Sequence, residues 1–289
     1  MRSLSFLWKT GLAIGIASLL LLFSIYQWGS YSYTQQVAVL AYHHLSHDEQ
    51  SNVTITPQLF REQLSFLRQK GYHFITLDQF KQFIEGGSVP NKAVLVTFDD
   101  GYESFYTYGY PILKELGIPA VNFVVTKDLH HPKRPHLPSL SQEEIRTMAL
   151  ETKDIDFQCH SHDMHAKMNG RPHLTSLLHR EGAAETPEEY RQRVLKDTNA
   201  CIRNLYELHS EPVDSYAYPF GMYHQEATDL IRQAGIKYAF TVASHMAIRA
   251  DDPMQIPRIN AGNPSITPES LHQTIMRRAI ARKLPVTRL

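Results

Sequence analysis

The chain has 289 residues, 43% of them hydrophobic, and its 29 basic side chains balance its 29 acidic ones. This length and hydrophobic content suffice for one large α/β domain with a buried core, or for two small domains. The zero net charge argues against nucleic acid as the main partner, because phosphate binding requires an excess of basic residues.

The first predicted element is a membrane anchor. Gly11 to Trp28 is free of charge, and Arg2 and Lys9 precede it. At 1.5 Å per residue this stretch spans roughly 27 Å, about the hydrocarbon thickness of a bilayer. Basic residues on its N-terminal side predict a cytoplasmic N-terminus and an outward-facing remainder. A cleaved signal peptide, which would make the protein secreted, is the alternative. No convincing small-x-small cleavage site precedes Ser32, so we expect an uncleaved anchor over residues 1–30.

Predicted strands and helices alternate through the rest of the chain. Capping residues indicate helix starts at Thr56-Pro57, Thr76-x-x-Gln79, Ser141-x-x-Glu144 and Thr186-Pro187-Glu188-Glu189. Apolar runs predict strands over 37–41, 73–76, 94–101, 119–125, 154–159, 213–218 and 237–242, with a further candidate over 255–259. Residues 166–185 read as an irregular loop. Repeated β-then-α units predict one parallel, barrel-like α/β domain over residues 36–289.

The central predicted strand ends in two adjacent carboxylates. Val94 to Phe98 is apolar apart from one threonine, and Asp99, Asp100 and Gly101 follow it directly. A buried parallel strand delivers polar groups to the carboxyl edge of its sheet, where α/β enzymes place their chemistry. One aspartate can hold a metal ion while the other accepts a proton from the attacking water. Taken alone, the motif fits an ordinary Asp-Gly turn about equally well.

A histidine cluster follows a later predicted strand. His160-Ser161-His162-Asp163-Met164-His165 comes directly after residue 159. Two imidazoles and a carboxylate form a three-ligand set for Zn²⁺ or a similar ion and leave one position open. A single loop histidine is more often solvated than bound to a metal. With Asp100 at the same sheet edge, the combination favours a metal site, with His162 also available as a ligand.

A third polar cluster contains Tyr218-Pro219-Phe220-Gly221. By itself it reads as a strand ending in an ordinary turn. As the wall of a site, such a rigid turn can present backbone N–H groups to a developing oxyanion.

Cys159 and Cys201 are the two cysteines of the chain. They do not make a disulfide-dense scaffold, and Cys159 directly precedes a candidate ligand. We expect no bridge between them.

The three clusters, in this order, resemble those of the NodB-homology polysaccharide deacetylases, carbohydrate esterase family 4. The resemblance is carried by Thr97-Phe98-Asp99-Asp100-Gly101, His160-Ser161 with His165, and Tyr218-Pro219-Phe220-Gly221, and it covers roughly residues 37–260. The opening Val39-Leu40-Ala41-Tyr42-His43-His44 is similar to that of the poly-β-1,6-N-acetylglucosamine deacetylases. The implied fold is a distorted (β/α)₇ barrel.

The resemblance also implies a role for each matched position. Asp99 becomes the general base and Asp100 the carboxylate ligand of a divalent ion. His160 and His165 become the imidazole ligands, and Phe220 contributes its backbone N–H to an oxyanion hole. Zn²⁺ is the favoured ion, with Co²⁺ or Ni²⁺ as alternatives.

Two positions depart from the family pattern. The third motif usually begins with an arginine that orients the base, and Ala217 stands there, so we expect Arg258 to replace it. The usual strand followed by a histidine general acid is absent after Ile259. The same unit occurs at the start of the chain, which makes His43 the expected acid in a circularly shifted barrel.

The sequence thus predicts a membrane-anchored, extracellular, metal-dependent enzyme that removes N-acetyl groups from an N-acetylglucosamine polymer and releases acetate. The expected partners are this polymer and the membrane, without nucleic acid. One alternative keeps the chemistry but replaces the substrate with peptidoglycan or chitooligosaccharides. Another is a catalytically silent domain that binds glycan at the cell surface.

Overall fold

The computed structural model describes residues 32–49, 51–133, 136–180 and 183–283. The chain divides into two compact units, residues 1–33 and 34–289. The predicted anchor over residues 1–30 lies outside the described residues. Within those residues, no helix combines the length and apolar character needed to cross a membrane.

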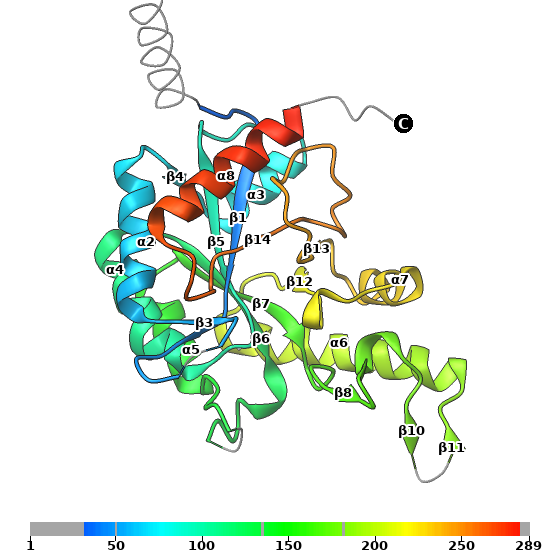
Figure 1. Ribbon diagram of the computed structural model, residues 1–289. Helices are drawn as coiled ribbons and strands as arrows, with labels where there is room; N and C mark the ends of the chain where they lie inside the picture. Colours follow the sequence, from blue (N-terminus) through cyan, green and yellow to red (C-terminus); the bar gives the residue numbers. More distant parts are fainter. Residues whose placement is uncertain (1–31, 50, 134–135, 181–182, 284–289) are drawn as a thin grey trace, which may run out of the picture. The chain divides into compact units, whose positions relative to one another are not determined.

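A parallel sheet forms the centre of the second unit (Figure 1). Seven strands follow the order β13-β12-β7-β6-β5-β1-β14, and β4 pairs with β5 beside this path. A parallel bridge between Phe240 and Ile256 brings β13 toward the segment before β14. The sheet is therefore the parallel half-barrel that a distorted (β/α) barrel requires. Its strands are β1 (Val37–Tyr42), β4 (His73–Phe74), β5 (Ala93–Phe98), β6 (Ala120–Val125), β7 (Ile155–Ser161), β12 (Ser215–Ala217), β13 (Tyr238–Phe240) and β14 (Ile259–Asn260).

The helices begin where the capping residues predicted. The Thr56 hydroxyl accepts a hydrogen bond from the Leu59 amide, and Thr76, Ser141 and Thr186 each form a reciprocal capping box with the residue three positions later. The helices are α2 (Pro57–Gln69), α3 (Leu77–Ile84), α4 (Tyr110–Leu116), α5 (Gln142–Glu151), α6 (Pro187–His209), α7 (Gln225–Gln233) and α8 (Pro268–Lys283). A π-helical turn η1 (Phe105–Gly109) precedes α4, and short 3₁₀ turns are η2 (Thr126–Asp128), η3 (His173–Thr175) and η4 (Pro219–Gly221).

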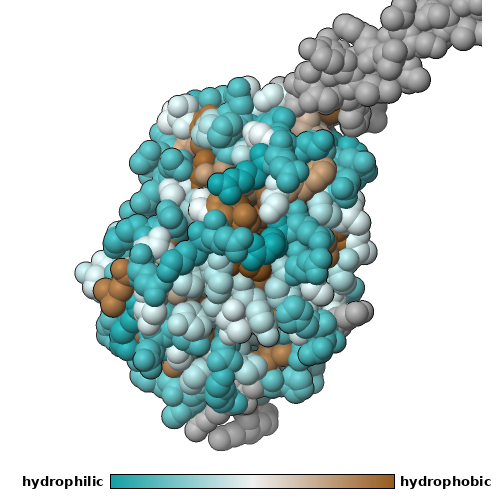
Figure 2. All heavy atoms as spheres, turned by 90° about the vertical axis from the view of Figure 1, so that its left-hand side faces the viewer, coloured by the Kyte–Doolittle hydropathy of each residue, from teal (hydrophilic) through white to brown (hydrophobic). Residues whose placement is uncertain are grey.

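The core lies between the sheet and its helices. Every residue of β1, β5 and β6 is buried, as expected for parallel strands covered on both faces. From α2, Phe60, Leu64 and Leu67 are fully buried at helical spacing. Each such side chain contributes roughly 1.5–3 kcal/mol through burial. Figure 2 shows that the face on the left of Figure 1, where α2 and α4 lie, is mostly hydrophilic, with hydrophobic residues in small groups.

Several sequence-based boundaries were wrong. β7 continues through His160 to Ser161, which pairs with Val125 after a shift in register at His160, whereas we expected the strand to end at 159. Residues 166–185 are not an irregular loop throughout: they contain the hairpins β8 (Lys167–Met168) with β9 (Arg171–Pro172) and β10 (His179–Arg180) with β11 (Ala183–Ala184). A further short pair, β2 (His44–Leu45) with β3 (Thr54–Ile55), was not predicted.

The expectation of unpaired cysteines was also wrong. Cys159 and Cys201 form a disulfide, with Cα atoms 6.0 Å apart. The residues are 42 positions apart in the chain, and they meet because α6 packs against β7. Their proximity depends on this packing, which no local pattern around either cysteine reveals.

Candidate active site

The predicted site residues meet at the carboxyl ends of adjacent strands. Tyr42 is in register with Phe98, so His43 and Asp99 follow β1 and β5 side by side. The Asp99 amide donates a 2.9 Å hydrogen bond to the Tyr42 carbonyl, which extends the pairing by one residue. His160 comes from the end of β7, two strands away in the sheet. The parallel topology therefore brings together residues that are distant in the sequence.

A strained turn presents Asp100. Asp100 and Gly101 both have positive φ angles, of 73° and 68°. A non-glycine residue rarely adopts this conformation, and such strain is concentrated at functional sites. At Gly101 a Cβ atom would lie 2.9 Å from Cγ1 of Val124, so the turn requires glycine both for its φ and for its close approach to β6.

Asp100, His160 and His165 form a cluster that could hold a metal ion. The Nε2 atoms of both histidines lie 3.2 Å from Oδ1 of Asp100, and the three candidate ligand atoms are all within 4.8 Å of one another. Oδ1 of Asp100 is buried without a hydrogen-bond partner among the described residues. His160 Nδ1 lies 2.8 Å from the carbonyl oxygen of Ala217, which favours a proton on Nδ1 and a free lone pair on Nε2. The donor set and the orphaned oxygen fit a divalent cation such as Zn²⁺.

The electrostatics of this cluster favour ligation. Burial raises the pKa of Asp100, but the interactions with His160 and then His165 outweigh burial and hold this pKa well below the usual range. Burial, with the neighbouring His160, lowers the pKa of His165 to about 4, so its imidazole is neutral at pH 7. Burial also lowers the pKa of His160, but the nearby carboxylates outweigh it and raise the pKa. Ligation through Nε2 would act against this rise, because a metal-bound histidine must be neutral.

Asp99 is held by a buried arginine. Arg258, which is 1% exposed, donates from Nη1 and Nη2 to the two carboxylate oxygens of Asp99 at 2.6 and 2.7 Å. Its Nε donates to the Thr241 carbonyl at 3.0 Å. Burial alone would raise the pKa of Asp99, but the charges of Arg258 and His160 lower it below 3.8 overall. Asp99 is therefore an ionised carboxylate in a fixed orientation.

His43 lies beside this carboxylate. Its Nε2 is 3.7 Å from Oδ2 of Asp99, and its side chain is 21% exposed. His44 faces elsewhere: its Nδ1 is 2.9 Å from the Ser104 hydroxyl. The opposite directions follow from the alternation of side chains along an extended chain.

The Phe220 turn borders the metal-ligand cluster. Phe220 has φ of 59°, and its ring stacks on His165 with centroids 4.4 Å apart. Lys167 lies over the same ring, with Nζ 4.2 Å from its centroid. Gly221 also has positive φ, and a Cβ there would lie 2.3 Å from Val242. This turn therefore contacts His165 through the Phe220 ring, and its backbone has little room to vary.

The structure separates the candidate histidines. His162 Nδ1 lies 3.0 Å from Thr126 Oγ1 and 3.4 Å from Asn204 Nδ2, so its ring is engaged away from Asp100.

Tyr102 was missed by the sequence reasoning. Burial, and then the charge and hydrogen bond of Asp100, raise the pKa of its hydroxyl, which remains protonated. Its position one residue after Gly101 was the available signal.

Comparison with known protein families identifies the class of this chain. Residues 86–239 match the polysaccharide deacetylase family, and the chain belongs to this family. It is therefore a hydrolase that acts on N-acetyl amide bonds.

Individual proteins agree with this assignment. The poly-β-1,6-N-acetyl-D-glucosamine N-deacetylase of Staphylococcus aureus is 27% identical over 214 residues, which cover 74% of this chain and 70% of that protein. The structure of a de-N-acetylase from Aggregatibacter actinomycetemcomitans covers 83% of this chain and 100% of its own, with 22% identity and a TM-score of 0.73. IcaB from Ammonifex degensii covers 84% of this chain and 97% of its own, with 24% identity and a TM-score of 0.71. The two structures show the shared fold.

Proposed function

We propose that this chain is a metal-dependent N-deacetylase of an N-acetylglucosamine-containing surface polysaccharide, with poly-β-1,6-N-acetylglucosamine as its substrate. The observation that carries the proposal is a complete set of ligands and proton-transfer groups at one sheet edge. The candidate ligand atoms of Asp100, His160 and His165 all lie within 4.8 Å of one another. The neighbouring Asp99 is paired with Arg258. The S. aureus relative with this named substrate supports the choice of polymer.

Asp100, His160 and His165 would hold the ion. When bound, a divalent cation supplies Lewis acidity at the acetamide oxygen and lowers the pKa of a water molecule in the site. A neutral His165 and an ionised Asp100 suit this role, since ligands must be deprotonated. Nitrogen and oxygen donors favour Zn²⁺, with Co²⁺ or Ni²⁺ as alternatives.

The remaining residues move protons and orient the reaction. Asp99, kept ionised by Arg258, accepts a proton from the water that attacks the acetamide carbon. The Phe220 N–H would donate to the oxyanion that develops on the carbonyl oxygen. His43, 3.7 Å from Asp99, would donate a proton to the nitrogen as the C–N bond breaks. The products are acetate and a free amine on the sugar.

We also propose that residues 1–30 anchor the enzyme in the cell membrane, with a catalytic domain over 36–289 outside the cell. A hydrophobic segment with basic residues before it supports this topology. The Cys159–Cys201 disulfide adds support, because such bonds are typical of oxidising compartments. Protease added to intact cells should remove the domain, and the mature protein should retain Met1. A mature N-terminus near residue 30 would make the segment a signal peptide.

The test of the proposed reaction is acetate release by the purified full-length protein. Poly-β-1,6-N-acetylglucosamine, peptidoglycan and chitooligosaccharides are compared at equal acetyl content, before and after removal of metal by a chelator and re-addition of Zn²⁺. We expect release from the β-1,6 polymer, its loss with the chelator and its recovery with Zn²⁺. Faster release from peptidoglycan or chitooligosaccharides would reassign the substrate. Glycan binding without acetate release would support a silent binding domain.

A further inference from the structure

One face of α6 contacts the segment that carries the candidate ligands His160 and His165. Arg193, Asp197 and Cys201 are spaced by four residues and therefore share a face of the helix. Each contacts a different part of residues 159–185. None of these three side chains has a role in the proposed reaction.

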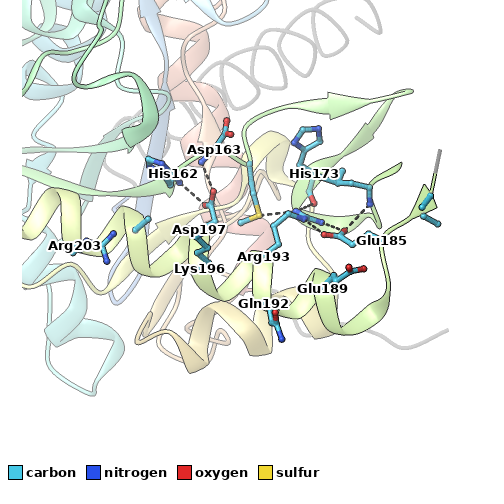
Figure 3. A pocket seen from close by; sticks show the side chains of 15 residues that line it. His162, Asp163, His173, Glu185, Glu189, Gln192, Arg193, Lys196, Asp197 and Arg203 are labelled. Atoms are coloured by element: carbon cyan, nitrogen blue, oxygen red, sulfur yellow. Dashed lines mark hydrogen bonds and ion pairs between the residues drawn. The ribbon is translucent and has the colours of Figure 1, made fainter. Parts of the chain in front are cut away.

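Asp197 contacts the backbone between the two ligands. Its Oδ1 accepts a 2.8 Å hydrogen bond from the His162 amide, and its Oδ2 accepts one of 2.6 Å from the Asp163 amide. The side chain is 7% exposed, so these charge-assisted hydrogen bonds are shielded from water. Figure 3 shows Asp197 pointing from α6 toward His162 and Asp163, with dashed lines to their backbone.

The other two residues of this face fix the ends of the segment. Cys201 is bonded to Cys159, directly before His160. Arg193 donates to the carbonyl oxygens of His173 and Ser176, at 2.9 Å each, and forms a bidentate pair with Glu185 (Figure 3). The ligand-bearing segment is thus attached to one helix before, between and after the two histidines.

The same segment is also held by η2. The Lys127 amide donates to the His162 carbonyl at 3.1 Å, and Lys127 Nζ pairs with Asp163 at 2.8 Å. His162 and Asp163 therefore contact both α6 and η2. Four residues separate His160 from His165, and these two are the middle ones, so their position influences how far apart the two imidazoles stand.

We infer that Asp197 is a positioning residue of the deacetylase site, which sets the spacing of His160 and His165 before an ion binds. The inference rests on the proposed function and deepens it. A group that orients metal ligands without touching the ion typically changes metal affinity or activity by about 10- to 100-fold when it is removed.

A cavity of about 700 Å³ offers the competing explanation. Asp197 also lines this cavity together with the exposed Lys196 and Arg203, so its carboxylate could serve a ligand bound there (Figure 3). Both of its oxygens already accept backbone hydrogen bonds, which favours the positioning role. Lys196→Ala alters the cavity without removing those bonds and is the matched control.

The test compares Asp197→Asn, Asp197→Ala and Lys196→Ala in the purified full-length protein. Zn²⁺ affinity is measured by competition with a chelator. Asparagine keeps the shape and one acceptor, so we expect Zn²⁺ affinity to fall about tenfold for Asp197→Asn and further for Asp197→Ala. Lys196→Ala should stay within about twofold of wild type. Equal loss in Lys196→Ala and Asp197→Asn, or unchanged affinity in a folded Asp197→Asn protein, overturns the inference.

Amide hydrogen exchange in the metal-free wild type gives a readout that needs no variant. If Asp197 positions the ligands in advance, the amides of His162 and Asp163 are protected before Zn²⁺ is added. Protection that arises only with Zn²⁺ shows that the ion orders the segment, and it overturns the inference. A wild-type chain that binds no ion and releases no acetate overturns the proposed function as well. Wild-type binding and activity with an unaffected Asp197→Asn variant overturn only the positioning role.

Discussion

The two segments that supply the candidate metal ligands are built in different ways. The first, Asp99 to Gly101, is a turn of consecutive residues in which Asp100 and Gly101 adopt positive φ angles at the end of β5. The second, residues 159–165, begins in β7 and continues into a loop held by α6 through Cys201 and Asp197. The first has a strained backbone and is held by Arg258 and by backbone hydrogen bonds to Tyr42 and Leu140. The second is held by side chains 34–42 positions later in the chain.

Because of this difference, changes in the two segments should affect the reaction in different ways. Disturbing the first segment should change the charge state and orientation of the base directly. Disturbing the second from α6 should leave every proposed reacting group present but less well positioned, and a shift of about 1 Å can cost a hundredfold in rate.

Arg258→Ala should have the largest effect. It leaves the Asp99 carboxylate buried without its partner, and breaking a buried ion pair in this way costs about 3–5 kcal/mol of unfolding free energy. Urea unfolding of the metal-free protein measures this loss, and acetate release should fall with it. Arg258→Lys keeps the charge but not the bidentate geometry, so it should lie between alanine and wild type. Wild-type stability in Arg258→Ala would contradict the pairing.

The same pair gives a pH dependence. Because the folded-state pKa of Asp99 lies below 3.8, its contribution to stability is present above about pH 4 and is lost as the pH falls through the lower folded value. Arg258→Ala should remove this part of the acid dependence. Unfolding curves from about pH 6 to below pH 3 would show it, and an identical acid profile in the variant would count against the linkage.

His43→Ala should follow in size. Loss of a positioned proton donor lowers kcat by a factor on the order of 10²–10⁴, and the metal content should remain unchanged because His43 is not a ligand in this scheme. His44→Ala is the control, since His44 contacts Ser104 instead of Asp99. Equal losses of kcat at both positions would contradict a specific role for His43.

Of these changes, loss of the disulfide should have the smallest effect on activity, although it lowers stability. Cys201→Ser opens a loop of 42 residues, for which chain entropy gives about 4 kcal/mol, and typical measured values are about 2–4 kcal/mol. Reduction of the wild type with dithiothreitol should give a similar shift in urea unfolding. The folded variant should retain most of its activity, because Asp197 still holds the amides of His162 and Asp163. Complete loss of activity in a folded protein would show that the bond does more than restrain the segment.

The same contrast explains how much the sequence could predict. The first segment and the helix starts were predictable because a few consecutive residues determine them, as with Asp99-Asp100-Gly101 and the Thr186 capping box. The meeting of His43 with Asp99 was expected from the family resemblance and a circularly shifted barrel, and the parallel pairing of β1 with β5 gives its physical reason.

Contacts of α6 were not predictable in that way. Asp197 lies in the middle of a long helix, where a polar residue usually marks a solvated face, and only the packing of α6 on β7 turns it toward the ligand segment. The disulfide was missed for the same reason. Arg258 is an intermediate case: a departure from the family motif at Ala217 prompted the search for another arginine, and the structure places it on Asp99 from 159 positions away.

The most direct test of the central claim is a comparison of His165→Ala with His162→Ala. The two histidines are three residues apart, but only His165 has its imidazole beside Asp100, whereas His162 faces Thr126. Bound metal per chain and acetate release are measured on the same preparations. The account predicts that His165→Ala loses both, while His162→Ala retains stoichiometric metal and most of its activity. Stoichiometric metal in His165→Ala, or its loss in His162→Ala, would contradict the ligand assignment.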